Sequence, residues 1–162
     1  MSKALDKFDI ALLNLLQANN VATAEILARH VALSPSAITR RVRRLRDNGL
    51  IAADVAILSD QFLGKRLRAV VQVQLNDHAE TGVIAELRKQ LAEARKVQLC
   101  LEITGPFDLM LVIVARDMAA FNAFADSVFG ANPGVRRYEA SFVKRQIRNA
   151  PAVWLDERDA ER

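Results

Sequence analysis

The hydrophobic periodicity of the chain changes once, at about residue 67, and this change constrains the fold more than any other feature. Before that point, apolar residues recur every three to four positions, as they do on amphipathic helices. From residue 67 they alternate with polar residues, as on a strand that buries one face. At 162 residues the chain is long enough for two small domains of different architecture, so we expect an α+β protein.

Three helices are expected in the first third of the chain, at residues 5–18, 24–31 and 35–48. Ser34 is a candidate N-cap for the third helix, and Pro35 stands at its first position, where a missing N–H does no harm. Three short helices with a tight turn before the last are typical of a helix-turn-helix fold.

Arginine is concentrated in the third of these helices. Residues 29–47 contain six arginines and one aspartate, a net charge of +5, whereas the whole chain carries +4, so the remainder carries −1. The apolar residues Ile38, Val42 and Leu45 recur every three to four positions and define an inward seam. The opposite face is therefore cationic, as expected of a surface that docks onto a polyanion.

The residues that we expect to contact DNA lie on this outward face or just before it. Arg46 is also expected to point outward, whereas Arg41 has a second interpretation, a structural ion pair within the protein. For the arginines of residues 40–46 as a group, the alternative is a helix face that is simply solvated. Like charges at helical neighbour spacing cost roughly a few tenths of a kcal/mol each, which favours phosphate binding over solvent. The expected DNA contacts are Ser34, Ser36, Thr39, Arg40, Arg43 and Arg44.

The chain from residue 67 onward is expected to form four strands and two helices in the order βαββαβ. This order is typical of a ferredoxin-like sandwich, in which four antiparallel strands carry two helices on one face. The second and third strands are expected to be central or well covered. The expected elements are strands at 67–76, 97–104, 108–115 and 135–147, a helix at 82–94, and a helix that Asp117 caps.

The second and third expected strands, 97–104 and 108–115, carry no aromatic residue. RNA-recognition motifs use a similar sheet but stack bases on exposed aromatic side chains, so RNA binding is the weaker interpretation. A large aliphatic sheet face instead indicates association between subunits. We therefore expect a homodimer or a larger assembly rather than a free monomer.

The expected organisation is a winged helix-turn-helix unit at 1–58, with a strand or wing at 50–58, a linker at 59–66, a ferredoxin-like unit at 67–150 and a charged tail at 151–162. The chain has no run of 18 or more apolar residues and no signal-peptide core at its start. We therefore expect a cytoplasmic protein that does not enter a membrane.

Eight short motifs occur in an order that resembles the Lrp/AsnC family of leucine-responsive and asparagine-specific regulators, over about residues 5–149. The resemblance implies a dimer formed mainly through the C-terminal domains, often built into tetramers or octamers, that binds double-stranded DNA to repress or activate genes. The motifs are Leu5-Asp6 with Asp9, Leu33-Ser34-Pro35-Ser36, Arg41-Val42-Arg43-Arg44-Leu45, Asn48-Gly49-Leu50-Ile51, Val97-Gln98 with Cys100, Thr104-Gly105 with Phe107-Asp108, Arg116-Asp117, and Pro133-Gly134-Val135.

The resemblance also implies that an amino acid or related metabolite binds between C-terminal domains, near the loop at 104–108. Backbone N–H groups of a glycine loop and one carboxylate suit a ligand that carries both a carboxylate and an ammonium. A tight turn between neighbouring strands is the plain alternative. The expected effector contacts are Leu101, Glu102, Thr104, Gly105, Phe107 and Asp108, and the departures from the family pattern are Pro106, Tyr138, Ala140 and Ala52-Ala53-Asp54.

Catalytic and metal sites are not expected, and neither is a cofactor. Some tetrapyrrole decarboxylases share this two-domain layout, but they use histidines, and this chain has only His30 and His78. The single cysteine, Cys100, makes neither an internal disulfide nor a zinc site by itself, and a lone cysteine is usually inert packing. An enzyme of that kind is therefore the weaker alternative to a regulator.

Overall fold

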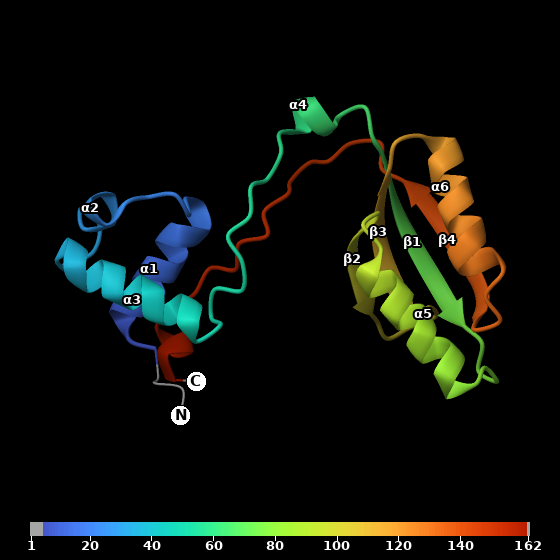
Figure 1. Ribbon diagram of the computed structural model, residues 1–162, viewed down its shortest axis with the longest axis horizontal. Coiled ribbons are helices and arrows are strands. Elements are labelled where there is room, and N and C mark those ends of the chain that lie inside the picture. The colour runs from blue at the N-terminus through green and yellow to red at the C-terminus, as the bar shows by residue number, and fades with distance from the viewer. Residues whose placement is uncertain (1–4, 162) are drawn as a thin grey trace. The chain divides into compact units, whose positions relative to one another are not determined.

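The computed structural model describes residues 5–161, which separate into two compact units (Figure 1). Unit 1 contains residues up to 57 together with those from 148 onward, and unit 2 contains residues 58–147. The chain therefore passes from one unit to the other twice. Residues 1–4 and 162, at the ends of the expected DNA-binding unit and charged tail, lie outside the described residues.

Unit 1 contains three helices, α1 (Lys7–Ala18), α2 (Ala24–Leu27) and α3 (Pro35–Asp47). Each begins where a side chain accepts backbone hydrogen bonds, and Ser34 caps α3 as expected. The second helix ends four residues earlier than expected and continues only as turns. The helix-turn-helix expectation is confirmed, since α2 and α3 are joined by a short, tight connection.

The core of unit 1 forms around the expected seam of α3. Ile38, Val42 and Leu45 are 0%, 7% and 0% exposed, and the first two pack in one cluster with Leu12 of α1 and Leu27 of α2. The wing segment differs from expectation, because residues 50–58 form no strand in the described chain. An extended segment becomes a strand only when another backbone pairs with it.

The expected charged tail belongs to unit 1, where it lies against α1 and ends in a short 3₁₀ helix, η2 (Glu157–Glu161). The side-chain amide of Asn14 donates to the carbonyl of Leu155 and accepts from its N–H, both at 2.9 Å. Gln17 forms the same pair of bonds with Val153, at 2.8 and 2.7 Å. Two amides one helical turn apart thus hold alternate residues of an extended backbone.

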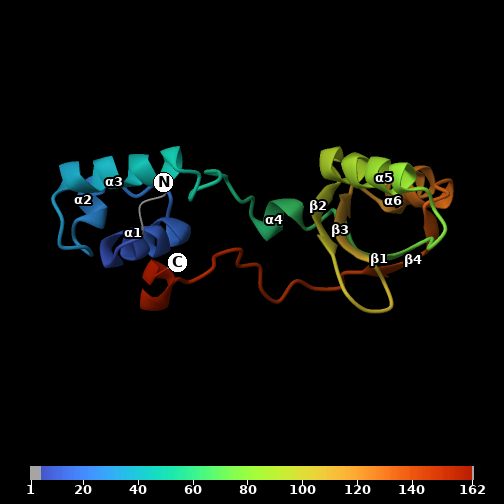
Figure 2. The same cartoon turned by 90° about the horizontal axis from the view of Figure 1, so that it is seen from below.

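Unit 2 confirms the order βαββαβ, with an additional short helix α4 (Asp60–Leu63) in the expected linker. The four strands form one antiparallel sheet in the order β2-β3-β1-β4. Figure 2 shows the two long helices of this unit on one face of the sheet. The elements are β1 (Leu67–Leu75), α5 (Thr81–Glu93), β2 (Val97–Glu102), β3 (Leu109–Ala115), α6 (Met118–Ala125) with a π-helical turn η1 (Asp126–Gly130), and β4 (Val135–Phe142).

The helix-covered face of the sheet is the core of unit 2, and the other face is open. Val71 and Leu111 are fully buried beneath the helices, whereas their neighbours Val70 and Val112 are half-buried on the open face. The fourth strand ends at Phe142 rather than Ile147. Within residues 5–161, no helix has the length and apolar character needed to cross a bilayer.

The second strand is an edge strand, so the expectation that it is central or well covered is wrong for β2. The central strands are β1 and β3. A register shift between Val97 and Leu99 sends these two residues to opposite faces, whereas strict alternation along a strand would put residues two positions apart on the same face. Val97 packs against the core, while Leu99 and Leu101 pair with Val112 and Met110 on the open face.

Candidate nucleic-acid interface

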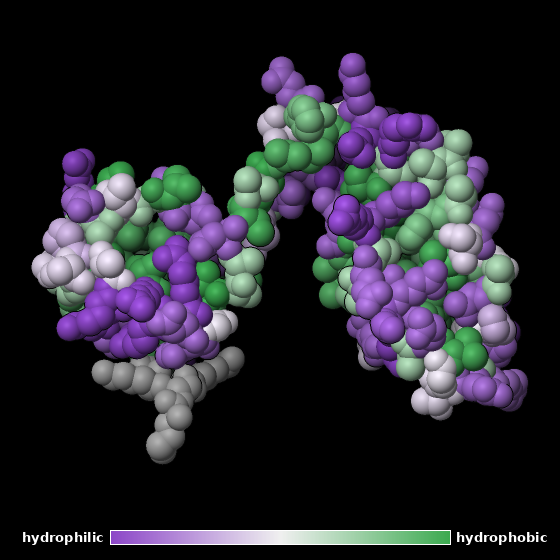
Figure 3. Space-filling model, viewed as in Figure 1, coloured by the Kyte–Doolittle hydropathy of each residue, from purple (hydrophilic) through white to green (hydrophobic). Residues whose placement is uncertain are grey.

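The outward face of α3 presents hydroxyl groups near its start and cations along its length. Ser36, Thr39, Arg40 and Arg43 are all exposed, as expected. The Ser36 hydroxyl lies 3.1 Å from that of Ser34, and the Thr39 hydroxyl donates to the carbonyl of residue 35 at 2.9 Å. Figure 3 shows strongly hydrophilic side chains gathered over this helix on the near face of unit 1.

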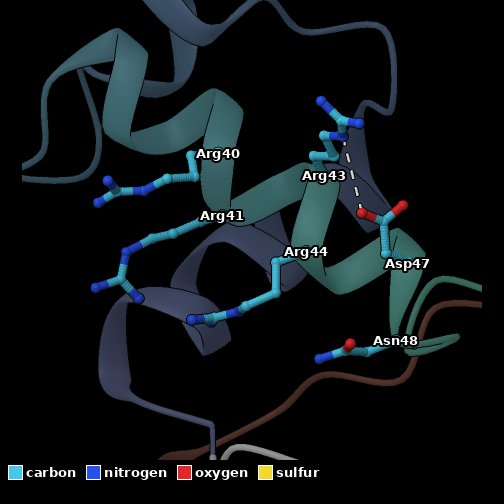
Figure 4. Close-up of a pocket in the computed structure, with 6 residues that line it drawn as sticks. All are labelled: Arg40, Arg41, Arg43, Arg44, Asp47 and Asn48. Atoms are coloured by element: carbon cyan, nitrogen blue, oxygen red, sulfur yellow. Dashed lines mark ion pairs between the residues drawn. The ribbon is translucent and has the colours of Figure 1, made fainter.

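The arginines of α3 point in two directions (Figure 4). Arg40, Arg41 and Arg44 extend to one side of the helix. An open hollow of about 490 Å³ is lined by these three together with Arg43, Asp47 and Asn48. Arg43 extends away from them, and its Nε lies 3.8 Å from the Asp47 carboxylate, with both side chains largely exposed. A pair this long and this exposed neutralises little charge.

A pair of aspartates at the start of α1 binds two of these arginines. Arg41 donates to Asp6 at 2.7 Å and to Asp9 at 2.9 Å, and Arg44 donates to the other oxygen of Asp9 at 2.6 Å. Asp9 is 1% exposed, and it is the only buried charged side chain in the described part of the chain. Its charge is therefore matched by two guanidinium groups, as burial of a carboxylate requires.

The same aspartates close the N-terminus of α1. Asp6 accepts from the N–H groups of Phe8 and Asp9, and the Asp9 side chain accepts from the N–H of Asp6, which forms a capping box. Burial opposes ionisation of Asp6, but hydrogen bonds from the Asp9 backbone and from Arg41 outweigh it and lower its pKa. The pKa of Arg41 is raised, mainly by its hydrogen bond to Asp6 and next by its hydrogen bond to Asp9.

The arginines of α3 therefore fall into two groups. The alternative for Arg41, a structural ion pair, is confirmed. Arg44 and Arg46 are expected from the sequence to point outward, but Arg44 is paired with the buried Asp9, and Arg46 lies 3.0 Å from Asp54. Among the described residues, Arg40 forms no ion pair, which leaves it with Arg43 as the cations of α3 most available to a ligand.

The expected effector loop at 104–108 forms a tight turn, and hydrogen bonds to β1 hold its C-terminal residue, Asp108. Gly105 has a φ of 134°, a conformation that favours glycine. Asp108 accepts a hydrogen bond from the N–H of Leu75 at 2.8 Å, and its own N–H donates to the carbonyl of Val73. Phe107 is 7% exposed, with the guanidinium of Arg137 5.0 Å from its ring centre. Thr104, Gly105 and Asp108 remain exposed.

The other expected effector residues do not lie together. Glu102 is paired with Arg88 of α5 at 2.6 Å, whereas Leu101 lies on the open face of the sheet. Burial, and then the charge of Glu102, raise the pKa of the neighbouring Cys100 thiol, which disfavours a nucleophilic thiolate. The structure therefore does not bring the six expected effector residues together in one place.

Comparisons with known proteins agree with both units. A family model described as the Lrp/AsnC ligand binding domain matches residues 68–153, and a winged helix-turn-helix DNA-binding model matches residues 5–52. An HTH-type transcriptional regulator from Sinorhizobium fredii is 34% identical over 94% of this chain and 89% of its own. The Bkd operon transcriptional regulator of Pseudomonas aeruginosa is 31% identical over 92% of this chain and 98% of its own.

A solved structure shows the same architecture. The crystal structure of a transcriptional regulator from Neisseria meningitidis in complex with L-Met superposes with a TM-score of 0.83 at 30% identity, and the match covers 92% of this chain and 96% of that one. These relatives are regulators, which favours that interpretation over the enzymatic alternative. The chain belongs to the Lrp/AsnC family of transcriptional regulators.

Proposed function

We propose that this regulator binds specific DNA sequences through the exposed face of α3, inserted in the major groove. Arg40 and Arg43 contact phosphates or base edges, and Ser36 and Thr39 make short-range groove contacts. The observation that carries the proposal is the exposure of Arg40 and Arg43, neither of which is held by a buried carboxylate.

Arg44 and Ser34 have supporting parts in the same proposal. The Arg44 side chain is 30% exposed, so it reaches a phosphate with donors that Asp9 does not use. The Ser34 hydroxyl already caps α3, and it positions the exposed N–H groups at the start of the helix near a phosphate.

The test is a double variant, Arg40→Ala/Arg43→Ala, compared with Lys89→Ala/Arg136→Ala, which removes the same charge from exposed positions of unit 2. Genome-wide mapping of bound DNA is expected to lose its peaks for the first variant and keep them for the second. Oligomer size is expected to be unchanged in both. Normal peaks for the α3 variant would contradict the assignment.

The proposed assembly is a homodimer that pairs the open sheet faces of two units 2, from which tetramers or octamers are built. Leu99 and Leu101 are about two-fifths exposed, and they lie beside Met110 and Val112 on an aliphatic area. Such an area is stable in water when a second apolar surface covers it. Two α3 helices in one dimer would then read half-sites one helical turn of DNA apart, about 34–36 Å, or a multiple of this. The site of action is the cytoplasm.

The proposed effector is an amino acid bound where two subunits bring their loops at 104–108 together. Exposed backbone around Gly105 suits a carboxylate, and Asp108 suits an ammonium group. The Neisseria meningitidis regulator was crystallised with L-Met, which makes methionine the first compound to try. Thermal shift against each amino acid, with Asp108→Asn as the comparison, is expected to find a ligand that raises the melting temperature of the unaltered chain only.

A further inference from the structure

A second cationic surface lies on unit 2, away from α3 in the sequence. Antiparallel pairing of β1 with β4 brings the segment before β1 next to the segment after β4, and the N–H of Val143 donates to the carbonyl of Arg68 at 2.8 Å. Two runs that are almost 80 positions apart thus meet at one end of the sheet. We call Lys65, Arg66, Lys144 and Arg145 the basic corner.

The four side chains of the basic corner are exposed. Arg66, Lys144 and Arg145 line one hollow of about 230 Å³. Among the side chains that the structure describes, no ion pair involves a member of the basic corner. Arg68, which also lines the hollow, donates to Gln146 instead. Clustered like charges without an ion-pair partner among the described side chains raise the free energy of the folded chain, and a bound polyanion removes that cost.

The lining of the hollow indicates which part of a polyanion it suits. Besides the cations, the described part of the lining consists of aliphatic residues, Gly64 and Gln146, and includes neither an aromatic ring nor a carboxylate. Surfaces that bind unpaired nucleotides stack bases on aromatic rings, which are missing from this lining. A cationic hollow without rings suits the phosphate oxygens of an intact duplex, whose contacts carry no sequence information.

We propose that the basic corner binds the phosphate backbone of duplex DNA outside the segment that α3 reads. This inference rests on the proposed DNA binding by α3, and it adds a contact on unit 2 that does not depend on the DNA sequence. It gives each subunit two cationic surfaces, so that a long duplex is held more tightly than one that spans only the half-sites.

The test uses the full chain and a variant that removes one cation from each run, Arg66→Gln/Lys144→Gln. The matched control is Lys89→Gln/Arg136→Gln, which removes one lysine and one arginine from exposed positions on α5 and at the other end of β4. The probe is a fluorescent mixed-sequence duplex of about six helical turns, roughly 60 base pairs. Anisotropy titrations at several salt concentrations give the slope of log K against log salt.

Each lost phosphate contact reduces this slope by about 0.9, so the basic-corner variant is expected to have a slope shallower by about 1.8 per subunit bound. Between about 50 and 200 mM salt, this difference corresponds to roughly a tenfold change in relative affinity. The control is expected to keep the slope of the unaltered chain. Equal slopes for all three proteins would overturn the inference.

The Arg40→Ala/Arg43→Ala variant, measured in parallel, separates this inference from the proposed function. If that variant loses its genomic binding sites while the basic-corner variant keeps the original slope, only the basic corner is wrong. If the α3 variant keeps its sites and the basic-corner variant has a shallower slope, α3 is wrong and the basic corner stands as a DNA contact. Unchanged circular dichroism and oligomer size in every variant exclude misfolding as the cause.

Discussion

The guanidinium of Arg44 lies 2.6 Å from the carboxylate of Asp9, which is 1% exposed at the start of α1. Arg41 bonds to the other oxygen of the same carboxylate. The most cationic helix of the protein therefore uses two of its arginines to hold α1. Because α1 and α3 are joined by these charges as well as by the apolar core, the orientation of the exposed face of α3 depends on a residue that is itself buried.

Replacing Asp9 with asparagine is expected to destabilise unit 1. The change leaves two partly buried guanidiniums without their shared carboxylate, and loss of a buried partner of this kind costs up to about 3 kcal/mol. Asp47→Asn is the control, since its pair with Arg43 is long and exposed and contributes close to nothing. Urea unfolding of both variants measures the difference. Equal stability of the two would mean that the cluster does not hold α1.

Acid is expected to weaken unit 1 through Asp6. Because its pKa in the folded chain is lowered from 3.8, the unfolded chain binds this proton more tightly. The stabilisation is therefore complete above the ordinary pKa and is lost as the pH falls through the lower, folded value. Asp6→Asn keeps a capping side chain but cannot titrate. Its free energy of unfolding should vary less than that of the unaltered chain below about pH 5, and an identical pH profile would contradict this role.

Periodicity predicted the parts of the fold that apolar side chains determine. The seam of Ile38, Val42 and Leu45 is visible in the sequence because each member is apolar, and the change of period at residue 67 gave the order of strands and helices. The partner of Arg44 was missed because position 44 borders that seam, and its long side chain reaches a carboxylate 35 residues earlier. The spacing of Asp6 and Asp9 was a usable signal, since acids three residues apart form a capping box.

Two other features, the register shift in β2 and the attachment of the tail, cannot be recognised from the pattern of apolar residues. The register shift in β2 moves Leu99 to the opposite face from Val97, and alternation alone cannot show an extra residue. The attachment of the tail depends on side-chain amides of α1 and on backbone groups of the tail, which every residue except proline supplies in full. Polar contacts between distant segments therefore required the structure.

Removing the amides of Asn14 and Gln17 is expected to release the tail from α1. Each amide makes two hydrogen bonds to the backbone of Val153 or Leu155, and each bond is worth about 0.5–1.5 kcal/mol. Trp154, the only tryptophan of the chain, lies between these anchors and serves as the probe. Its fluorescence anisotropy should fall in Asn14→Ala/Gln17→Ala and stay unchanged in Gln90→Ala on α5. An unchanged signal in the first variant would show that other contacts hold the tail.

Alanine at two glycines of unit 2 is expected to have opposite effects. A Cβ at Gly105 or at Gly82 meets no atom within 4 Å, so crowding does not distinguish them. Gly105 has a φ of 134°, where a side chain costs about 1–3 kcal/mol of strain. Gly82 lies in α5, where alanine stabilises by about 0.4–1 kcal/mol. Thermal unfolding should show a lower melting temperature for Gly105→Ala and a higher one for Gly82→Ala, and shifts of the same sign would refute the strain at the loop.

Charges on the open face of the sheet are expected to separate the subunits. Leu99→Glu/Leu101→Glu places two carboxylates in the aliphatic area, where association would bury them without partners. Ala85→Glu/Ala92→Glu adds the same charge to exposed positions of α5, so it controls for net charge. Light scattering should give a species near 18.0 kDa for the first variant and the unaltered oligomer for the second. Because Leu99 and Leu101 lie on the open face of an edge strand, they can change without disturbing the core beneath β1 and β3. An oligomer that survives both substitutions would place the subunit contact elsewhere, and the proposed effector site between subunits would lose its basis with it.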